Sequence, residues 1–459
     1  MSIVPSIRTD EKSISHAITQ FISVYGIVDL LARCGGTKAK GSSAAELFTY
    51  ILTNMFRSGS FYMQQKLGRV PAVFAKNTYY RFLMNPRTNW LRFTTMLSER
   101  IINQHLRRLS SENRDDCFVI DDSLYERIGF RRTELASSVF DHVSHRFKKG
   151  FRLLTLGWTD GCTFLPINYS LLASANKENI LGPCGKIDRR TNAGKRRVMA
   201  RQKATVVMIE LLKMALASGH RAKYVLFDSW FSNPHQIVEI KDLGLDVIAM
   251  VKKSTKRTYL FAGKRMDVKA IFASCKKRRG RSRYLLSVPV KVGQDKENEH
   301  AIDARLVYVR NRNNRKDWIA ILCTNLELSE QDIIRIYGHR WDIEVFFKTC
   351  KSSLLLRRED HGLSYDGLTA HVAMVFTRYM LLSVSKRDDE DSRTIGELFY
   401  LMIEEVADIT FNQSMQILVD AMLATVQETF RLTDAQVESF YKDFLSKLPA
   451  PMNRLLQAA

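Results

Sequence analysis

The amino-acid sequence predicts an α/β protein whose core is interrupted by an all-β insertion and flanked by helical domains. Residues 111–252 alternate short apolar runs with amphipathic helical runs, the pattern of helices packed on a sheet. Residues 253–315 lose the helical period and read as strands between charged turns. The α/β pattern resumes over 316–385. Helical periods mark both ends, so we expect a helical N-terminal domain over 1–110 and a helical C-terminal region over 386–459.

The N-terminal range contains several helical patterns. The first covers residues 13–34 and ends at Gly35, a typical helix C-cap. Residues 76–82 combine cations, polar side chains and tyrosines at a helix start, which suits a DNA-recognition helix carrying Asn77 and Arg81. The apolar members of the same segment are equally suited to a core: Tyr79, Phe82 and Leu83.

Two strands of the predicted core end in an aspartate. Residues 117–120 form a short buried strand that is followed by Asp121 and Asp122. Residues 223–227 form a second strand, followed by Asp228. In α/β sheets, functional groups gather just past the carboxyl ends of buried strands. Asp121 is the favoured candidate of the first pair, and Asp122 remains the alternative.

Residues 337–351 predict a helix with one acidic residue among several cations. Its polar residues recur at steps of 3, 4, 4 and 3, so at about 100° per residue they share a narrow arc; they are Tyr337, Arg340, Glu344, Lys348 and Lys351. An apolar stripe runs beside this arc. The helix therefore buries one edge and presents Glu344 along it.

Three acids from separate elements, Asp121, Asp228 and Glu344, are the candidate catalytic residues and metal ligands. An all-oxygen set suits Mg²⁺ or Mn²⁺. Two such ions, about 3.5–4 Å apart, can activate a water and stabilise the leaving oxygen of a phosphodiester. Each acid alone has a common structural explanation, as a turn residue or a solvated helix pair. Their combination is the more specific signal.

The composition points to a polyanionic partner. The 459 residues include 70 Lys and Arg against 48 Asp and Glu, which gives a net charge of +22 and favours nucleic acid over a membrane. We expect no membrane span, because no apolar run reaches the ~18 residues that span a bilayer. The seven cysteines contain no Cys-x-x-Cys pair, so we expect a reducing, cytoplasmic environment.

On these residues the chain resembles the DDE transposases of bacterial insertion sequences, in the branch with a Y-x2-R-x3-E-x6-K signature. Tyr337, Arg340, Glu344 and Lys351 match that signature at every spacing. The resemblance implies a ribonuclease H-like core with a β insertion between the second Asp and the Glu. It also implies that Tyr337, Arg340 and Lys351 contact DNA phosphates near the transposon end.

The resemblance adds a further candidate, Trp318. Some members of the family have a tryptophan near this place that stacks on a flipped base. A tryptophan packed in the core at a strand start is the alternative explanation.

Two other segments contain residues that could bind DNA or a metal. The run 185–203 is rich in cations and lies near the strand that carries Asp228, so we expect it to track DNA; its candidates are Arg189, Arg190, Lys195, Arg196 and Arg197. His142 and His145 are not expected to form a metal pair, because a three-residue step along a strand points them to opposite faces.

The sequence therefore predicts a DNA transposase that binds the terminal inverted repeats of its element and uses two Mg²⁺ or Mn²⁺ ions for strand cleavage and transfer. The expected partner is double-stranded DNA, with a homodimer in the synaptic complex and a cytoplasmic, nucleoid-associated location. A catalytically silent, transposon-derived DNA-binding protein and another ribonuclease H-like nuclease are the alternatives.

Overall fold

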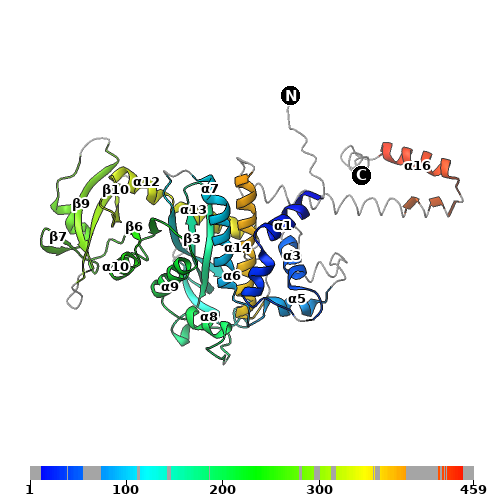
Figure 1. Cartoon of the computed structure of the whole chain (residues 1–459), viewed down its shortest axis with the longest axis horizontal. Helices are drawn as coiled ribbons and strands as arrows, with labels where there is room; N and C mark the ends of the chain where they lie inside the picture. The colour runs from blue at the N-terminus through cyan, green and yellow to red at the C-terminus, as the bar shows by residue number, and fades with distance from the viewer. Residues whose placement is uncertain are drawn as a thin grey trace.

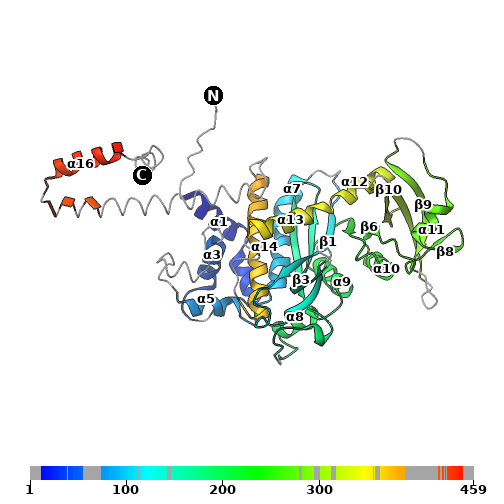
Figure 2. The same ribbon diagram turned by 180° about the vertical axis from the view of Figure 1, so that it is seen from behind.

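The structure is a computed structural model in which one sheet runs through the molecule with helices on its faces (Figures 1 and 2). The residues it describes are 12–38, 40–54, 74–110, 114–141, 146–185, 187–278, 282–293, 300–311, 317–354, 356, 362–388, 422–423, 426–427, 429–430 and 432–447. All structural statements below concern these residues.

The strands of this part of the chain form one mixed, 11-stranded sheet. In chain order they are β1 (Cys117–Glu126), β2 (Ser137–Asp141), β3 (Arg146–Thr159), β4 (Phe164–Leu172), β5 (Tyr224–Phe227), β6 (Asp246–Val251), β7 (Tyr259–Phe261), β8 (Lys264–Met266), β9 (Tyr284–Val292), β10 (Ile302–Arg310) and β11 (Trp318–Cys323). Across the sheet the order is β2-β3-β1-β5-β6-β11-β10-β9-β7-β8, and β4 pairs with the later part of β3.

The core of the sheet consists of five neighbouring strands in the order β4-β3-β1-β5-β6. Strand β3 is antiparallel to both β4 and β1, whereas β1, β5 and β6 run parallel. Every residue of β4 is buried, because helices cover both faces there. This mixed arrangement is consistent with the expected ribonuclease H-like core.

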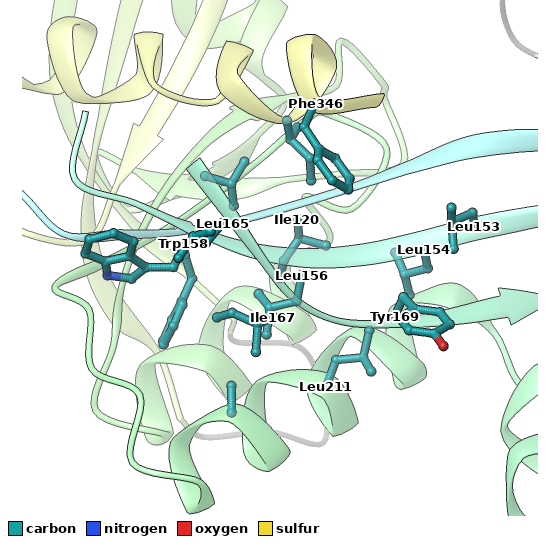
Figure 3. Close-up of a cluster of buried hydrophobic side chains, with 14 of the residues drawn as sticks. Ile120, Leu153, Leu154, Leu156, Trp158, Leu165, Ile167, Tyr169, Leu211 and Phe346 are labelled. Carbon is teal, nitrogen blue, oxygen red and sulfur yellow. The ribbon is translucent and has the colours of Figure 1, made fainter. Parts of the chain in front are cut away.

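Helices cover the two faces of these strands. Figure 3 shows Phe346 on one side of the strands and Leu211 on the other, with Ile120 and Leu156 between them. The helices in this part of the chain are α6 (Trp90–Ile101), α7 (Arg107–Leu109), α8 (Asn192–Ala200), α9 (Ala204–Ala217), α10 (Pro234–Asp242), α12 (Glu330–Gly338), α13 (Trp341–Ser352) and α14 (Tyr365–Asp388). Phe346 belongs to α13 and Leu211 to α9, so the expected three-layer packing is present.

The sequence predicted an all-β segment over 253–315, but the structure has a helix within it. The helix α11 (Val268–Ser274) lies between β8 and β9, and the Asp267 carboxylate caps it by accepting hydrogen bonds from two backbone N–H groups. The strands also continue the core sheet, because β10 pairs with β11 and β11 pairs with β6. Local alternation predicted the strands, but it contains no information on this long-range pairing.

The predicted helix over 13–34 is two helices, α1 (Lys12–Val24) and α2 (Ile27–Arg33). Gly26 between them has a φ of 54°, a left-handed conformation that interrupts the helix and that glycine adopts without steric cost. The predicted C-cap at Gly35 is confirmed, with a φ of 78°. Helices α3 (Ala44–Asn54) and α5 (Lys76–Leu83) follow.

The helix α14 forms much of the contact between the N-terminal helices and the core. It packs against α3, α5, α6, α13 and β4, and it lies beside α6 in both views (Figures 1 and 2). By length and composition its segment Tyr365–Arg387 could cross a membrane, which the sequence analysis had not expected of any segment. The whole apolar window is buried inside the fold, as in the core helix of a globular domain.

The C-terminal range is described only in part. It contains α16 (Asp434–Lys447), which agrees with the helical period there. The predicted amphipathic patterns over 394–409 and 412–430 lie largely outside the described residues.

Candidate active site

The pairing of β1 with β5 brings two aspartates together. Ile120 pairs with Phe227 in the parallel register, and the next residues along the two strands are Asp121 and Asp228. Their charges interact, since Asp228 contributes to raising the pKa of Asp121. Asp121 does not follow the end of its strand as predicted, because β1 continues to Glu126, but it lies beside Asp228 just past the end of β5.

Alternation along β1 separates Asp121 from Asp122, because neighbouring side chains of a strand point to opposite faces. Asp121 faces α13, and its Oδ2 lies 3.4 Å from Nη1 of Arg340. Asp122 forms an ion pair with Arg152 of β3. Of the two alternatives that the sequence left open, this geometry favours Asp121 as the site carboxylate.

The predicted single helix over 337–351 is interrupted at His339 and Arg340, where α12 gives way to α13. The N–H groups of these residues donate to the carbonyls of Ile336 and Tyr337, at 3.0 and 3.1 Å, in the tighter three-residue spacing of a 3₁₀ turn. Both residues keep helical dihedral angles, so the apolar period passes through the interruption almost unchanged. That is why the sequence pattern does not reveal it.

The guanidinium group of Arg340 joins two of the candidate acids. Its Nη2 donates to Oε1 of Glu344 at 2.6 Å, while its Nη1 reaches Asp121. The arginine side chain is 14% exposed, so this contact is largely shielded from water. Among the described residues no three His, Cys, Asp or Glu side chains form a ready-made metal cluster. The positive charge of Arg340 therefore lies between the carboxylates of Glu344 and Asp121.

The chemistry of the donor set nevertheless fits a divalent cation. Burial raises the pKa of Asp121 to about 7, and the neighbouring charge of Asp122 adds to this, while Arg340 acts in the opposite direction. A carboxylate that is costly to ionise gains strongly from a cation. Asp228 beside it and Glu344 across the arginine offer further oxygen atoms, the ligands that Mg²⁺ and Mn²⁺ prefer.

A pocket of about 490 Å³ opens beside Asp121 and Asp228. Its lining also includes two further acids, two cations and three aromatic residues, namely Asp122, Asp141, Arg152, Lys351, Phe140, Trp230 and Phe231. Lys351, one of the predicted phosphate contacts, donates to the hydroxyl of Ser123. The sequence analysis missed Arg152, Phe140 and Trp230. Only Trp230, two residues after a strand-end aspartate, had a local signal; the other two reach the pocket through strand pairing.

The remaining polar residues of the signature differ in exposure. Tyr337 is half-buried, with its ring centroid 6.0 Å from the guanidinium of Arg340. Burial raises the pKa of its hydroxyl, and the charge of Arg340 opposes this. Lys348 is exposed on α13. Tyr337 therefore packs against the site arginine, while Lys348 is open to a ligand at the surface.

Trp318 packs in an aromatic cluster within the β9–β11 part of the sheet. Its ring stacks on Phe272 with centroids 4.8 Å apart, and it meets Tyr308 edge-on at 5.1 Å. The ammonium group of Lys253 lies 4.2 Å from the Trp318 centroid. These contacts match the packing explanation of this tryptophan, and a role in base stacking stays a prediction.

The predicted DNA-tracking run divides into two groups. Arg196 and Arg197 were predicted to track DNA but do not face outward. Their side chains are 12% and 11% exposed and are ion-paired. Arg197 binds both Glu134 and Asp366, at 2.7 Å each. The others are exposed, although Arg190 pairs with Asp188: Arg189, Arg190 and Lys195. Arg189 and Arg190 precede α8, whereas on α8 itself Arg196 and Arg197 lie toward the core and Lys195 lies on the exposed side.

The candidate recognition helix α5 presents its polar side outward. Asn77 and Arg81 are exposed, and the apolar residues that the sequence allowed to be core are buried, namely Tyr79, Phe82 and Leu83. The two histidines weighed as a metal pair, His142 and His145, lie outside the described residues.

Comparison with known proteins gives one family match. The family model described as "DDE superfamily endonuclease" matches residues 63–315, which is more than half of the chain. This range includes Asp121, Asp228 and the residues that line the pocket except Lys351, and it ends before the signature helix. A search of curated proteins found no match.

Proposed function

Since this chain belongs to the DDE superfamily of endonucleases, we propose that it is a DNA transposase that cuts the ends of an insertion sequence and joins them to target DNA. The observation that carries the proposal is the position of Asp121 on β1 beside Asp228, which follows the adjacent parallel strand β5, with Glu344 linked to Asp121 by Arg340. The net charge of +22 supports DNA as the substrate.

We assign Asp121, Asp228 and Glu344 to the binding of two Mg²⁺ or Mn²⁺ ions. When bound, these ions would lower the pKa of a water and neutralise charge on the phosphate. Arg340, Lys351 and the exposed Lys348 would bind the phosphates on either side of the bond that breaks, and Tyr337 would fix the orientation of Arg340.

The proposed reaction has two steps at phosphorus. In the first, the oxygen of water bonds to the phosphorus at the element's end, the bond to the 3′-oxygen breaks, and that oxygen takes up a proton. In the second, the freed 3′-hydroxyl loses its proton and attacks a phosphorus of the target strand, whose own 3′-oxygen leaves. The carboxylates and cations named above position both phosphates, and no redox partner is needed.

We further propose that the exposed face of α5, with Asn77 and Arg81, helps to recognise the terminal inverted repeats, and that two copies of the chain pair the two ends. Arg189, Arg190 and Lys195 would contact the DNA backbone. DNA of the nucleoid would be the target.

The test uses the purified full-length protein with DNA that carries the repeats flanking its gene. Glu344→Gln should bind this DNA as the wild type does, while Mg²⁺-dependent cleavage falls by roughly 100-fold or more, because a metal ligand is lost. The matched control is Glu438→Gln on α16, which also removes a helical glutamate paired with a cation four residues away. Normal cleavage by Glu344→Gln would refute the mechanism, and absence of cleavage by the wild type would refute the function.

A further inference from the structure

The turn after β5 presents an aromatic ring to the candidate active site. Trp230 stands two residues after Asp228, lines the pocket and is 44% exposed, although tryptophan is usually well covered. The turn itself is held firmly, because Arg257 donates to the backbone carbonyls of Ser229 and Ser232, at 2.9 and 3.1 Å. The ring is thus displayed by a fixed piece of backbone.

Two cations lie at this ring. The guanidinium carbon of Arg152 is 5.7 Å from the Trp230 centroid, and the Lys252 ammonium is 5.5 Å away. An aromatic face edged by positive charge is the combination with which proteins bind single-stranded nucleic acid, where the ring takes the base and the cations take the phosphates.

The opposite wall of the pocket contributes apolar surface from the β2–β3 hairpin. Phe140 lines the pocket and is paired across the strands with Phe147, their centroids 5.4 Å apart. Phe147 is 70% exposed, so the aromatic surface continues from the pocket to the outside. Arg146 and Lys148, its neighbours on β3, are cations. Exposed apolar side chains among cations are the means by which DNA-binding proteins separate stacked bases.

The size of the pocket limits what it holds. A volume of about 490 Å³ lies within the roughly 300–1,000 Å³ of pockets that take a single small ligand, and is too small for a duplex. The lining also includes Asp121 and Asp228, beside which the proposed function places the reacting phosphate. A single unstacked nucleotide of that DNA fits this volume.

We propose that this pocket, which the sequence analysis did not assign, is a subsite for one unstacked nucleotide, with its base on Trp230 and its backbone at Arg152 and Lys252. The inference rests on the proposed function for the origin of that nucleotide. The aromatic pair of Phe140 and Phe147 separates it from its neighbour in the strand. The subsite places the nucleotide beside the scissile phosphate.

The test compares two fluorescent probes that share a backbone: the tetranucleotide dT4 and its abasic tetrahydrofuran analogue. Anisotropy titrations with the full-length wild type should give roughly 10-fold tighter binding of dT4, since stacking on an aromatic ring is worth about 1–3 kcal/mol per base. Trp230→Ala should bind both probes with the weak affinity of the abasic one. Trp230→Phe should keep part of the preference.

Controls separate base stacking from charge and from folding. Lys252→Gln should weaken the binding of both probes by the same factor. Phe440→Ala, which removes an exposed aromatic side chain on α16, should change neither affinity. Melting curves should coincide, because Trp230 is largely at the surface. Equal binding of the two probes by the wild type, or an unchanged preference in Trp230→Ala, would overturn the subsite. These probes carry no transposon end, so the result is independent of cleavage, whose failure would instead refute the proposed function.

Discussion

Arg340 links Asp121 and Glu344, with Nη2 at 2.6 Å from Oε1 of Glu344 and Nη1 at 3.4 Å from Oδ2 of Asp121. One guanidinium thus neutralises two carboxylates that a buried site could not otherwise hold together without cost. The same positive charge repels a metal ion. The arginine must therefore move, or share its partners, before Glu344 can bind a cation together with Asp121.

Replacing this arginine should change metal affinity in the absence of DNA. Arg340→Gln removes the competing charge, so we expect Mn²⁺ to bind the DNA-free protein roughly 10-fold more tightly, as follows from about 1.5–3 kcal/mol for a hydrogen bond to a charged group. Titration calorimetry measures this affinity directly. Lys348→Gln, an exposed cation on the same helix, is the control and should have little effect. An unchanged or weaker Mn²⁺ affinity in Arg340→Gln would contradict the competition.

Two arginines of the same basic run should respond differently to the same substitution. Arg197→Gln should lower the free energy of unfolding by about 3 kcal/mol, because it removes the arginine partner of Glu134 and one of the two arginine partners of Asp366. Arg190→Gln should leave stability unchanged, since that side chain is 91% exposed. Urea denaturation of both variants measures the difference.

DNA binding provides the second half of this comparison. If Arg190 contacts a phosphate, Arg190→Gln should weaken binding uniformly across sequences and reduce the slope of log K against log salt by about 1. Equal stability of the two variants would contradict the structural role of Arg197, and an unchanged salt slope would contradict the DNA role of Arg190.

A buried histidine should make stability depend on pH. His220 is 1% exposed and contacts the Ser98 hydroxyl, and burial lowers its pKa from 6.5 to about 4. Because the unfolded chain takes up the proton at higher pH than the folded chain, stability falls as pH drops below about 6.5. Between pH 7 and pH 4.5 this one group should cost roughly 2–3 kcal/mol.

The measurement is chemical denaturation of wild type and His220→Gln at both pH values. Other groups titrate in both proteins. The comparison is therefore between the unfolding free energy that the wild type loses on acidification and the smaller loss expected of His220→Gln. His235, which is exposed, provides the comparison through His235→Gln. A loss in His220→Gln equal to that of the wild type would show that the histidine is not the responsive group.

Local pattern was enough to predict the pieces of the site. The apolar runs before Asp121 and Asp228 are buried strands, and the segment with Glu344 is helical, because each signal depends on neighbouring residues only. The register that sets Asp121 beside Asp228 is a long-range pairing, which local pattern does not contain. The sequence could not choose between Asp121 and Asp122, because only a partner on another strand, Arg152, distinguishes them.

The errors share a physical cause. Arg197 carries a charge that suits DNA, yet it is engaged by residues distant in sequence. The helix interruptions at Gly26 and Arg340 depend on dihedral angles and hydrogen-bond spacing, which hydrophobic period does not report. Long-range packing thus decides which plausible side chains remain available for chemistry.

The unbroken ladder from β4 through β6 and β11 to β8 has a mechanical consequence. Backbone hydrogen bonds join β5, the strand before Asp228, through β6 and β11 to the outer strands of the same sheet. We therefore expect a force on the outer strands to reach Asp121 and Asp228 as a tilt or twist of the sheet, without any hinge.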